Sequence, residues 1–377
     1  MSKYGLCQLT NIPSNQQNYD IIDKRLNNIS IISITLIKET TGLKSNMELT
    51  IKPYDSSFEN KWDDFIVKES LNGTFLHTRN FLNYHPEGRF EDCSLMVMNG
   101  TNIVAVIPAC KIKEDDKNIF SSHSGSTFGG IVLCSNSYNI NYLTEILPLI
   151  EKYLSDNGFS EIIYKNASEI FCNKKMDLLD YFLFKNGYNQ YNEVSFVIPT
   201  KELKEDVTAN FVYGRRRHYK YSLKQSLVFK ELVEDDEVSE FHYVLCENLK
   251  KFDTKPVHTL EEIIEFKNKR LTENVKFYGV YKDNKLVAGS MVFLFGKKVF
   301  HTQYLAAHPD YLNLYPMEFM DTNMIKIAKE QNYEYFSFGI STEDHGKVLN
   351  EGLALFKEGF GASYCINRTY YKKLKAN

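Results

Sequence analysis

The stretch that most constrains the fold of this chain runs from residue 276 to 362, because two kinds of periodicity follow one another there in a fixed order. Two alternating β-rich runs flank Asp283-Asn284, which are turn residues that tolerate positive φ, so a hairpin is predicted. A strand over 297–308, a loop, a helix over 317–332 and a strand over 333–340 are predicted next. These elements build an open αβ unit whose loop faces a helix N-terminus, a natural place for a phosphate or carboxylate.

A similar order of signals occurs earlier in the chain, which indicates a duplicated αβ domain split near Pro199. Four matches recur in the same order, with offsets that differ only by loop lengths: His77-Thr78 with His258-Thr259, Val104-Ala105 with Val287-Ala288, the segment after Asn157 with that after Asn332, and Phe184-Lys185 with Phe356-Lys357. The alternative is that unrelated αβ units share this turn chemistry. The predicted boundaries are 1–46 for an N-terminal extension of uncertain status, 47–198 for the first domain and 199–377 for the second.

Composition narrows the class of protein. The chain has 377 residues, of which 43% are hydrophobic and 25% charged, enough for two cores of ordinary size. No run approaches the roughly 20 apolar residues of a membrane span, and the first residues lack the apolar block of a signal peptide, so a cytoplasmic protein is expected. Seven scattered cysteines without a CxxC favour free thiols. The net charge of −3 argues against a general nucleic-acid coat.

A basic segment joins the two predicted domains. It reads Tyr213-Gly-Arg-Arg-Arg-His-Tyr-Lys on a predicted helix. Arg215 and Arg217 are candidate substrate-binding residues, because guanidinium groups bind phosphates with two parallel hydrogen bonds, as in a nucleotide, a phosphosugar or a tRNA backbone. The alternative is a solvated helix that pairs with the acidic run 234–237.

The order of hairpin, strand, Tyr-Pro loop, helix and strand, followed by Leu355-Phe-Lys-Glu-Gly-Phe-Gly, resembles the second domain of Fem-type transferases. More broadly, it resembles the FemAB-like or BioF2-like branch of the GNAT acyltransferase superfamily. The resemblance covers about residues 47–374. It implies an α/β fold of two tandem GNAT-like domains, each a mixed, mostly antiparallel sheet flanked by helices. It also implies transfer of an acyl or aminoacyl group to an amine, which in the Fem enzymes moves from aminoacyl-tRNA to a peptidoglycan precursor.

The resemblance assigns further site residues. Lys357 occupies the place of a Lys that lines the transfer site, and Tyr315 belongs to the Tyr-Pro loop. The Gly-rich loop of the first half resembles the Gly-Gly loop of domain one in such proteins, and its candidate substrate-binding residues are His123, Thr127, Gly129 and Gly130. This loop fits either a phosphate site or a tight turn. Lys185 holds the place of Lys357 in the first half, so a lysine that merely reaches solvent from a helix end is the alternative for both.

The sequence departs from ordinary GNAT enzymes at the loop 308–316, which contains no Gly. A Gly-rich loop is what lets backbone N–H groups approach the coenzyme A pyrophosphate. No cofactor is therefore firmly implied, and acyl-CoA, an acyl carrier protein or aminoacyl-tRNA remain as donors. Four acids near the strand ends are candidate general bases: Asp310, Glu318, Asp321 and Asp344. Glu318 and Asp310 are the assigned catalytic acids, although an acid at a helix N-terminus is more often a cap.

Other chemistries lack their motifs, since the sequence has no GxSxG, HExxH, P-loop or GxGxxG after a strand. No metal site is predicted. We expect an acyltransferase that acts on a small-molecule or sugar-linked amine of a cell-envelope or polysaccharide precursor. A tRNA or a carrier protein is the expected donor partner. The alternative is a binding module that kept the GNAT fold and lost the donor site.

Overall fold

The computed structural model describes residues 48–375, apart from the side chain of Phe252. Residues 49–377 belong to one compact unit. The predicted extension 1–46 lies outside the described residues, and the predicted boundary at 198/199 stays a prediction. No described helix is long and apolar enough to cross a membrane.

The first half begins with a strand after Met47 and a helix, α2, that has a π-helical continuation over Phe65–Glu69. Its regular elements are β1 (Leu49–Pro53), α2 (Glu59–Asp64), α3 (Arg79–Leu82), β2 (Glu91–Asp92), β3 (Leu95–Asn99), β4 (Asn102–Ile107), β5 (Ala109–Glu114), β6 (Lys117–Ser122), β7 (Val132–Leu133), α4 (Ile140–Asp156), β8 (Glu161–Lys165), α5 (Asp177–Lys185) and β9 (Asn189–Pro199).

The second half has a similar but not identical order of elements. They are α6 (Tyr213–Ser222), β10 (Val228–Glu231), α7 (Asp235–Leu249), α8 (Leu260–Glu265), β11 (Val275–Lys282), β12 (Lys285–Phe295), β13 (Val299–Ala307), α9 (Pro316–Glu330), β14 (Tyr335–Ile340), β15 (Thr342–Glu343), β16 (Val348–Leu349), α10 (Glu351–Glu358) and β17 (Ser363–Lys373). The predicted hairpin joins β11 and β12, with Asp283 and Asn284 both at positive φ. The threonine of each repeated His-Thr pair caps a helix: Thr78 caps α3 and Thr259 caps α8.

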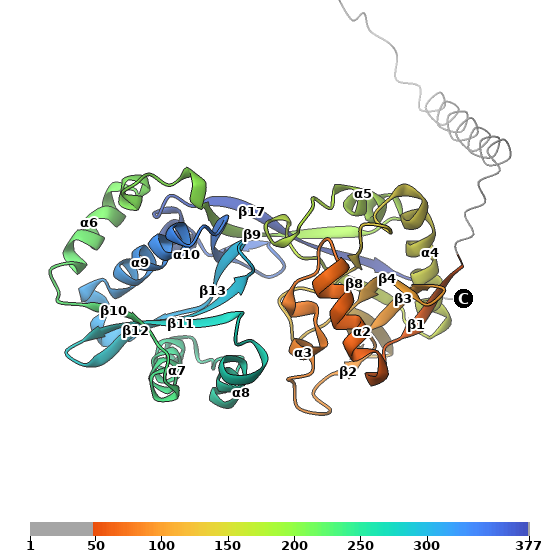
Figure 1. The fold of residues 1–377 in the computed structure, drawn as a ribbon, viewed down its shortest axis with the longest axis horizontal. Coiled ribbons are helices and arrows are strands. Elements are labelled where there is room, and N and C mark those ends of the chain that lie inside the picture. The colour runs from red at the N-terminus through yellow and green to blue at the C-terminus, as the bar shows by residue number, and fades with distance from the viewer. Residues whose placement is uncertain (1–47, 376–377) are drawn as a thin grey trace, which may run out of the picture. The chain divides into compact units, whose positions relative to one another are not determined.

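Helices cover both faces of each half (Figure 1). In the second half, α7 and α8 pack against one face of β11–β13, and α9 and α10 against the other. In the first half, α2 lies on one face while α4 and α5 lie on the other. This is the mixed, mostly antiparallel α/β fold that the sequence predicts.

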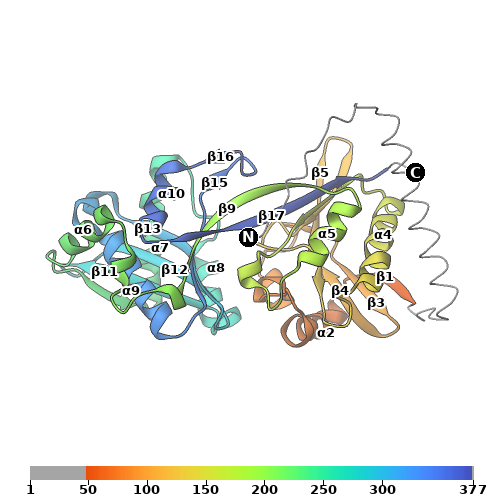
Figure 2. The same cartoon turned by 90° about the horizontal axis from the view of Figure 1, so that it is seen from above.

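The last strand of each half pairs with the sheet of the other half. Within the described residues, eleven strands form one sheet in the order β10-β11-β12-β13-β14-β9-β17-β8-β6-β5-β2. β9 of the first half pairs with β14, and β17 of the second half pairs with β8. Figure 2 shows β9 and β17 running side by side, antiparallel over Asn189–Val197 and Ser363–Tyr371. The two halves are therefore joined by strand exchange, which the linear split at Pro199 does not express.

The strands of the two halves are arranged differently in one respect. β12 is continuous, whereas its counterpart in the first half is broken at Pro108 into β4, in a separate sheet β1-β3-β4-β7, and β5, in the large sheet. Proline has no backbone N–H for a ladder, so it ends the pairing on that side. The two halves thus share much of their element order, although α6 and the β15–β16 pair occur only in the second half and the first half divides its strands between two sheets.

Candidate functional site

The two parallel strands at the centre of the second half part after three residue pairs. β13 and β14 pair only from Val299 with Tyr335 to His301 with Ser337. The register of β13 then shifts against β12, and that of β14 shifts against β9, so β13 carries a bulge just beyond Thr302 and β14 carries one just beyond Ser337. From that point the two strands follow different neighbours. Bulges near a parting of strands redirect side chains and backbone groups, as is common beside active sites.

In the first half, backbone of the same chain occupies the place where the corresponding parallel strands, β6 and β8, separate. β6 and β8 also pair over only three residues. Beyond them, Gly129 N–H donates to the Lys165 carbonyl at 2.8 Å, and Gly130 N–H donates to Ser122 Oγ at 2.8 Å. Gly130 has a φ of 78°, and a Cβ atom there would collide with Asn166 Oδ1. Because both N–H groups bond within the chain, the tight-turn interpretation of this loop is favoured over a phosphate site.

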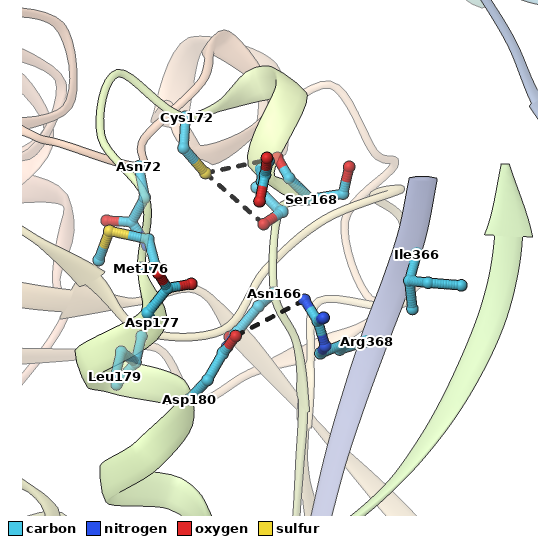
Figure 3. Close-up of a pocket in the computed structure, with 12 residues that line it drawn as sticks. Asn72, Asn166, Ser168, Cys172, Met176, Asp177, Leu179, Asp180, Ile366 and Arg368 are labelled. Atoms are coloured by element: carbon cyan, nitrogen blue, oxygen red, sulfur yellow. Dashed lines mark hydrogen bonds and ion pairs between the residues drawn. The ribbon is translucent and has the colours of Figure 1, made fainter. Parts of the chain in front are cut away.

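A small pocket adjoins the place where β6 and β8 separate (Figure 3). It lies where β8 ends, between α5 and β17, and Arg368 of β17 reaches Asp180 of α5 at 3.6 Å. Its volume is about 30 Å³, the space of about one water molecule. Cys172 beside it is buried, and burial raises the pKa of its thiol to about 12, so it is not a nucleophile. The first half therefore offers no room for an acyl donor at this position.

In the second half, Lys357 on α10 lies at the end of β14, where β13 and β14 separate. It is only 3% exposed, and its Nζ donates to the carbonyls of Gly339 at 3.1 Å and Ile340 at 2.5 Å, at the end of β14. Burial lowers the pKa of Lys357 to about 8, although the nearby Asp321 acts in the opposite direction. Lys185, its match in the first half, is exposed. The alternative of a solvated lysine thus fits Lys185 and does not fit Lys357.

Two further ionisable groups lie near Lys357. Asp321 on α9 is fully buried, neither of its carboxylate oxygens has a partner among the described residues, and burial followed by repulsion from Glu318 raises its pKa well above the usual range. His301 on β13 donates to or accepts from Ser337 Oγ at 3.0 Å, and burial lowers its pKa to about 4, so the imidazole is neutral at pH 7. Asp321 is among the candidate general bases that the sequence indicates, whereas His301 is not predicted as a site residue. The burial of both depends on how the strands part.

Glu318 on α9 is buried and paired with α6. Its Oε1 accepts from Arg215 Nη1 and lies 3.3 Å from His218 Nδ1. The His218 ring stacks on Tyr315, with centroids 4.4 Å apart, and Tyr315 precedes α9 with a φ of 55°. The anion at the N-terminus of α9 is therefore this protein's own carboxylate, held by a guanidinium and beside an imidazole.

The other predicted residues lie apart from this cluster. Asp310 is exposed, 3.8 Å from His308 Nδ1. Arg217 is exposed and makes no hydrogen bond or ion pair with the described residues. Thr127 is half-buried, and His123 is buried against His85, with a ring separation of 5.4 Å. Burial lowers the pKa of His123 to about 4.

The proposed pairing of α6 with the acidic run 234–237 is wrong. Asp235 binds Lys267 and Glu237 binds Lys230, while Glu234 and Glu237 form a capping box at the start of α7. Those acids serve their own helix and its neighbours. Outward from α6 point Arg217, Lys220 and Lys224, with the exposed rings of Tyr213 and Tyr221 among them.

Comparison with known proteins gives one family match. Residues 229–347, which contain β11 to β14 and both parted strands, match the acetyltransferase (GNAT) domain family. No curated protein matches the chain.

Solved structures share the fold over most of the chain at low sequence identity. FemX has a TM-score of 0.62 at 11% identity, over 86% of this chain and 97% of its own. L-PGS from Bacillus licheniformis has a TM-score of 0.54 at 12% identity, over 86% and 94%. A tandem GNAT protein from the clavulanic acid biosynthesis pathway has a TM-score of 0.52 at 8% identity, over 88% and 100%.

Proposed function

Because this chain carries a GNAT acetyltransferase domain within the tandem, Fem-type GNAT fold, we propose that it transfers an acyl or aminoacyl group to an amine of a cell-envelope or polysaccharide precursor. The reaction is attack of a neutral amine on an ester or thioester carbonyl. Such a reaction needs positioning, a proton acceptor and stabilisation of the oxyanion, and no covalent enzyme intermediate.

The observation that carries this proposal is the buried ammonium of Lys357 at the parting of β13 and β14. A charge held in a dry site by two backbone carbonyls is already oriented before the reaction. Its field acts strongly on charge that develops nearby, because little water screens it. We assign Lys357 to the oxyanion that forms on the donor carbonyl.

Neighbouring groups take supporting roles in this proposal. Arg215 and His218 hold the Glu318 carboxylate, so Glu318 is a positioning residue rather than the general base. His301 is neutral and lies at the last pair of β13 and β14, where its imidazole can accept a proton. Asp310 is too exposed and too far along the preceding turn to join this cluster by any described contact.

The N-terminus of α9 argues for a donor other than coenzyme A. Pro316 is the first helical residue and has no N–H, and the carboxylate of Glu318 occupies the first turn. A pyrophosphate brought there would meet a negative charge and one donor fewer than an ordinary helix offers. We therefore propose aminoacyl-tRNA as the donor, with the exposed cations of α6 as contacts for its phosphates. An acyl carrier protein or acyl-CoA are the alternatives.

Mass spectrometry tests the activity directly. Purified protein is incubated with charged tRNA, or with acyl-CoA, and with amino sugars or amine-bearing peptidoglycan precursors. A new amide that needs the protein and charged tRNA supports the proposal. If no donor yields a product, while ligands still bind and co-purify, the second candidate holds: a binding module that kept the fold. The proline and acid at the start of α9 are the observation that favours this candidate.

A further inference from the structure

A second cluster of reactive side chains lies on α7, away from Lys357 and its neighbours. His242, Cys246 and Lys250 follow one another at intervals of four residues, so they share one face of the helix and its continuation. All three line a pocket of about 560 Å³ between α7 and the segment that leads into α8. Pro256 and Leu260 give this pocket apolar surface, and the charges of Lys250, Lys255, Asp253 and Glu261 balance around it.

The hydrogen bonds of His242 determine which nitrogen carries the proton. Its Nε2 lies 3.4 Å from the carbonyl oxygen of His258, which can only accept, so Nε2 is the donor. In the neutral ring Nδ1 is then an acceptor, and it lies 3.8 Å from Cys246 Sγ. Thiol, imidazole and carbonyl thus form a chain in which the imidazole is set to take the thiol proton. An adjacent base of this kind is what activates a cysteine.

The other described cysteines lack this arrangement. Burial raises the pKa values of the Cys93, Cys172 and Cys365 thiols. Cys110 and Cys134 are buried. Cys246 is partly exposed. One effect opposes activation, since Cys246 lies in the last turn of α7, where the helix dipole disfavours a thiolate. His242 lies one turn before Cys246, and Lys250, whose ammonium pairs with Glu247, lies one turn after it.

We propose that Cys246, activated by His242, is a thiol-modification site that takes small disulfides from the adjoining pocket. In the step, the thiol proton passes to His242 Nδ1 and the Cys246 sulfur attacks one sulfur of the disulfide. The S–S bond of the reagent breaks, a mixed disulfide forms, and the released thiolate takes the proton from His242. Cys246 is oxidised and half of the reagent is reduced, so no other oxidant is required.

The probe for this site is 4,4′-dithiodipyridine, a neutral aromatic disulfide, applied to the full chain. All proteins carry Cys7→Ser, because Cys7 lies outside the described residues. Peptide mass spectrometry identifies the modified thiol, and the same reaction in urea gives the reference rate of each thiol in the unfolded chain. We expect Cys246 to react at least about tenfold faster in the folded protein than in the unfolded chain, and dithiothreitol to reverse the adduct.

Variants separate activation from simple exposure. Cys246→Ser is expected to remove the fast phase, and His242→Gln to slow it about tenfold or more. Cys93→Ser and His345→Gln, a change at an exposed histidine on another segment, leave it unchanged. A fast phase that survives Cys246→Ser overturns the proposal, as does a folded rate no higher than the unfolded one. The comparison of the folded with the unfolded rate needs no variant, so it tests the proposal even if His242→Gln fails to fold.

Discussion

Individual side chains were predictable where a short motif and its chemistry coincide. Lys357 was chosen from its motif, and the structure places it in the interior with two backbone carbonyls as partners. The same reasoning included Asp321 among the candidate bases without indicating that it is buried, and it gave no sign of His301 as a site residue. Their burial follows from the parting of β13 and β14 and from the packing of α6 over α9, which no local pattern in the sequence specifies.

The lowered pKa of Lys357 makes a prediction about stability. In the unfolded chain this lysine titrates near its ordinary value of 10.5, and in the folded protein near 8. Between these values the unfolded state binds more protons, so the contribution of this group to stability rises with pH. Relative to Lys357→Met, the free energy of unfolding of the parent should rise by about 2 kcal/mol between pH 8 and pH 10.

Urea titrations at both pH values measure this difference in the free energy of unfolding, with Lys185→Met as the control that shows no such trend. A pH-independent difference between parent and Lys357→Met would mean that Lys357 keeps an ordinary pKa.

Helices and hairpins were the most predictable elements, because their signals are local. The hairpin at Asp283-Asn284, the helix α9 and the basic helix α6 all lie where their patterns place them. What the basic run does was not predictable from charge alone. One face of α6 is fixed by Glu318 and by aromatic rings, and the other carries the exposed cations Arg217 and Lys220.

The two faces of α6 predict opposite results for two arginines that are two residues apart. Arg215 is 13% exposed and holds the buried Glu318, so Arg215→Met leaves a buried carboxylate without its main partner. We expect a loss of about 3 kcal/mol in the free energy of unfolding. Arg217→Met changes an exposed side chain and should stay within about 0.5 kcal/mol of the parent. Equal effects in urea denaturation would show that the Arg215–Glu318 pair contributes little.

The outer face of α6 makes a prediction about binding. Lys220→Glu should weaken binding of charged tRNA by about tenfold at low salt and reduce its salt dependence, since one phosphate contact is replaced by repulsion. Lys185→Glu, an equally exposed change on α5, should have little effect. Fluorescence anisotropy at two salt concentrations measures both. Indistinguishable affinities would remove α6 from the proposed donor site.

For the whole molecule, the repeated order of signals predicted two similar halves, and each half has helices on both faces of its strands. The sequence signals did not predict that β9 and β17 are exchanged, because the sequence of a strand shows which of its faces is buried and does not show which strands it pairs with. The halves also share a core, in which Phe75, Phe128 and Phe171 of the first half pack with Phe293 and Phe295 of the second.

The exchange predicts that the two halves unfold together. Trp62 is the one tryptophan of the sequence and is fully buried in the first half, so its fluorescence reports on that half, whereas circular dichroism reports on both. The two urea transitions should coincide. Phe336→Ala, in the core of the second half, should lower both midpoints equally, and Phe184→Ala, at an exposed position, should move neither. A Trp62 transition that ignores Phe336→Ala would show that the halves are independent.

The most direct test of the central claim compares transfer by Lys357→Met and Lys185→Met. Both lysines occupy matched places, and only Lys357 is buried at the parting of the central strands. With the donor and acceptor that give a product, the account predicts that Lys357→Met lowers kcat/KM roughly a hundredfold, the cost of losing one oxyanion donor. Lys185→Met should stay within a few fold of the parent. Equal and small effects at the two positions would contradict the account, because Lys357 would then be a structural residue and the transfer site would lie elsewhere.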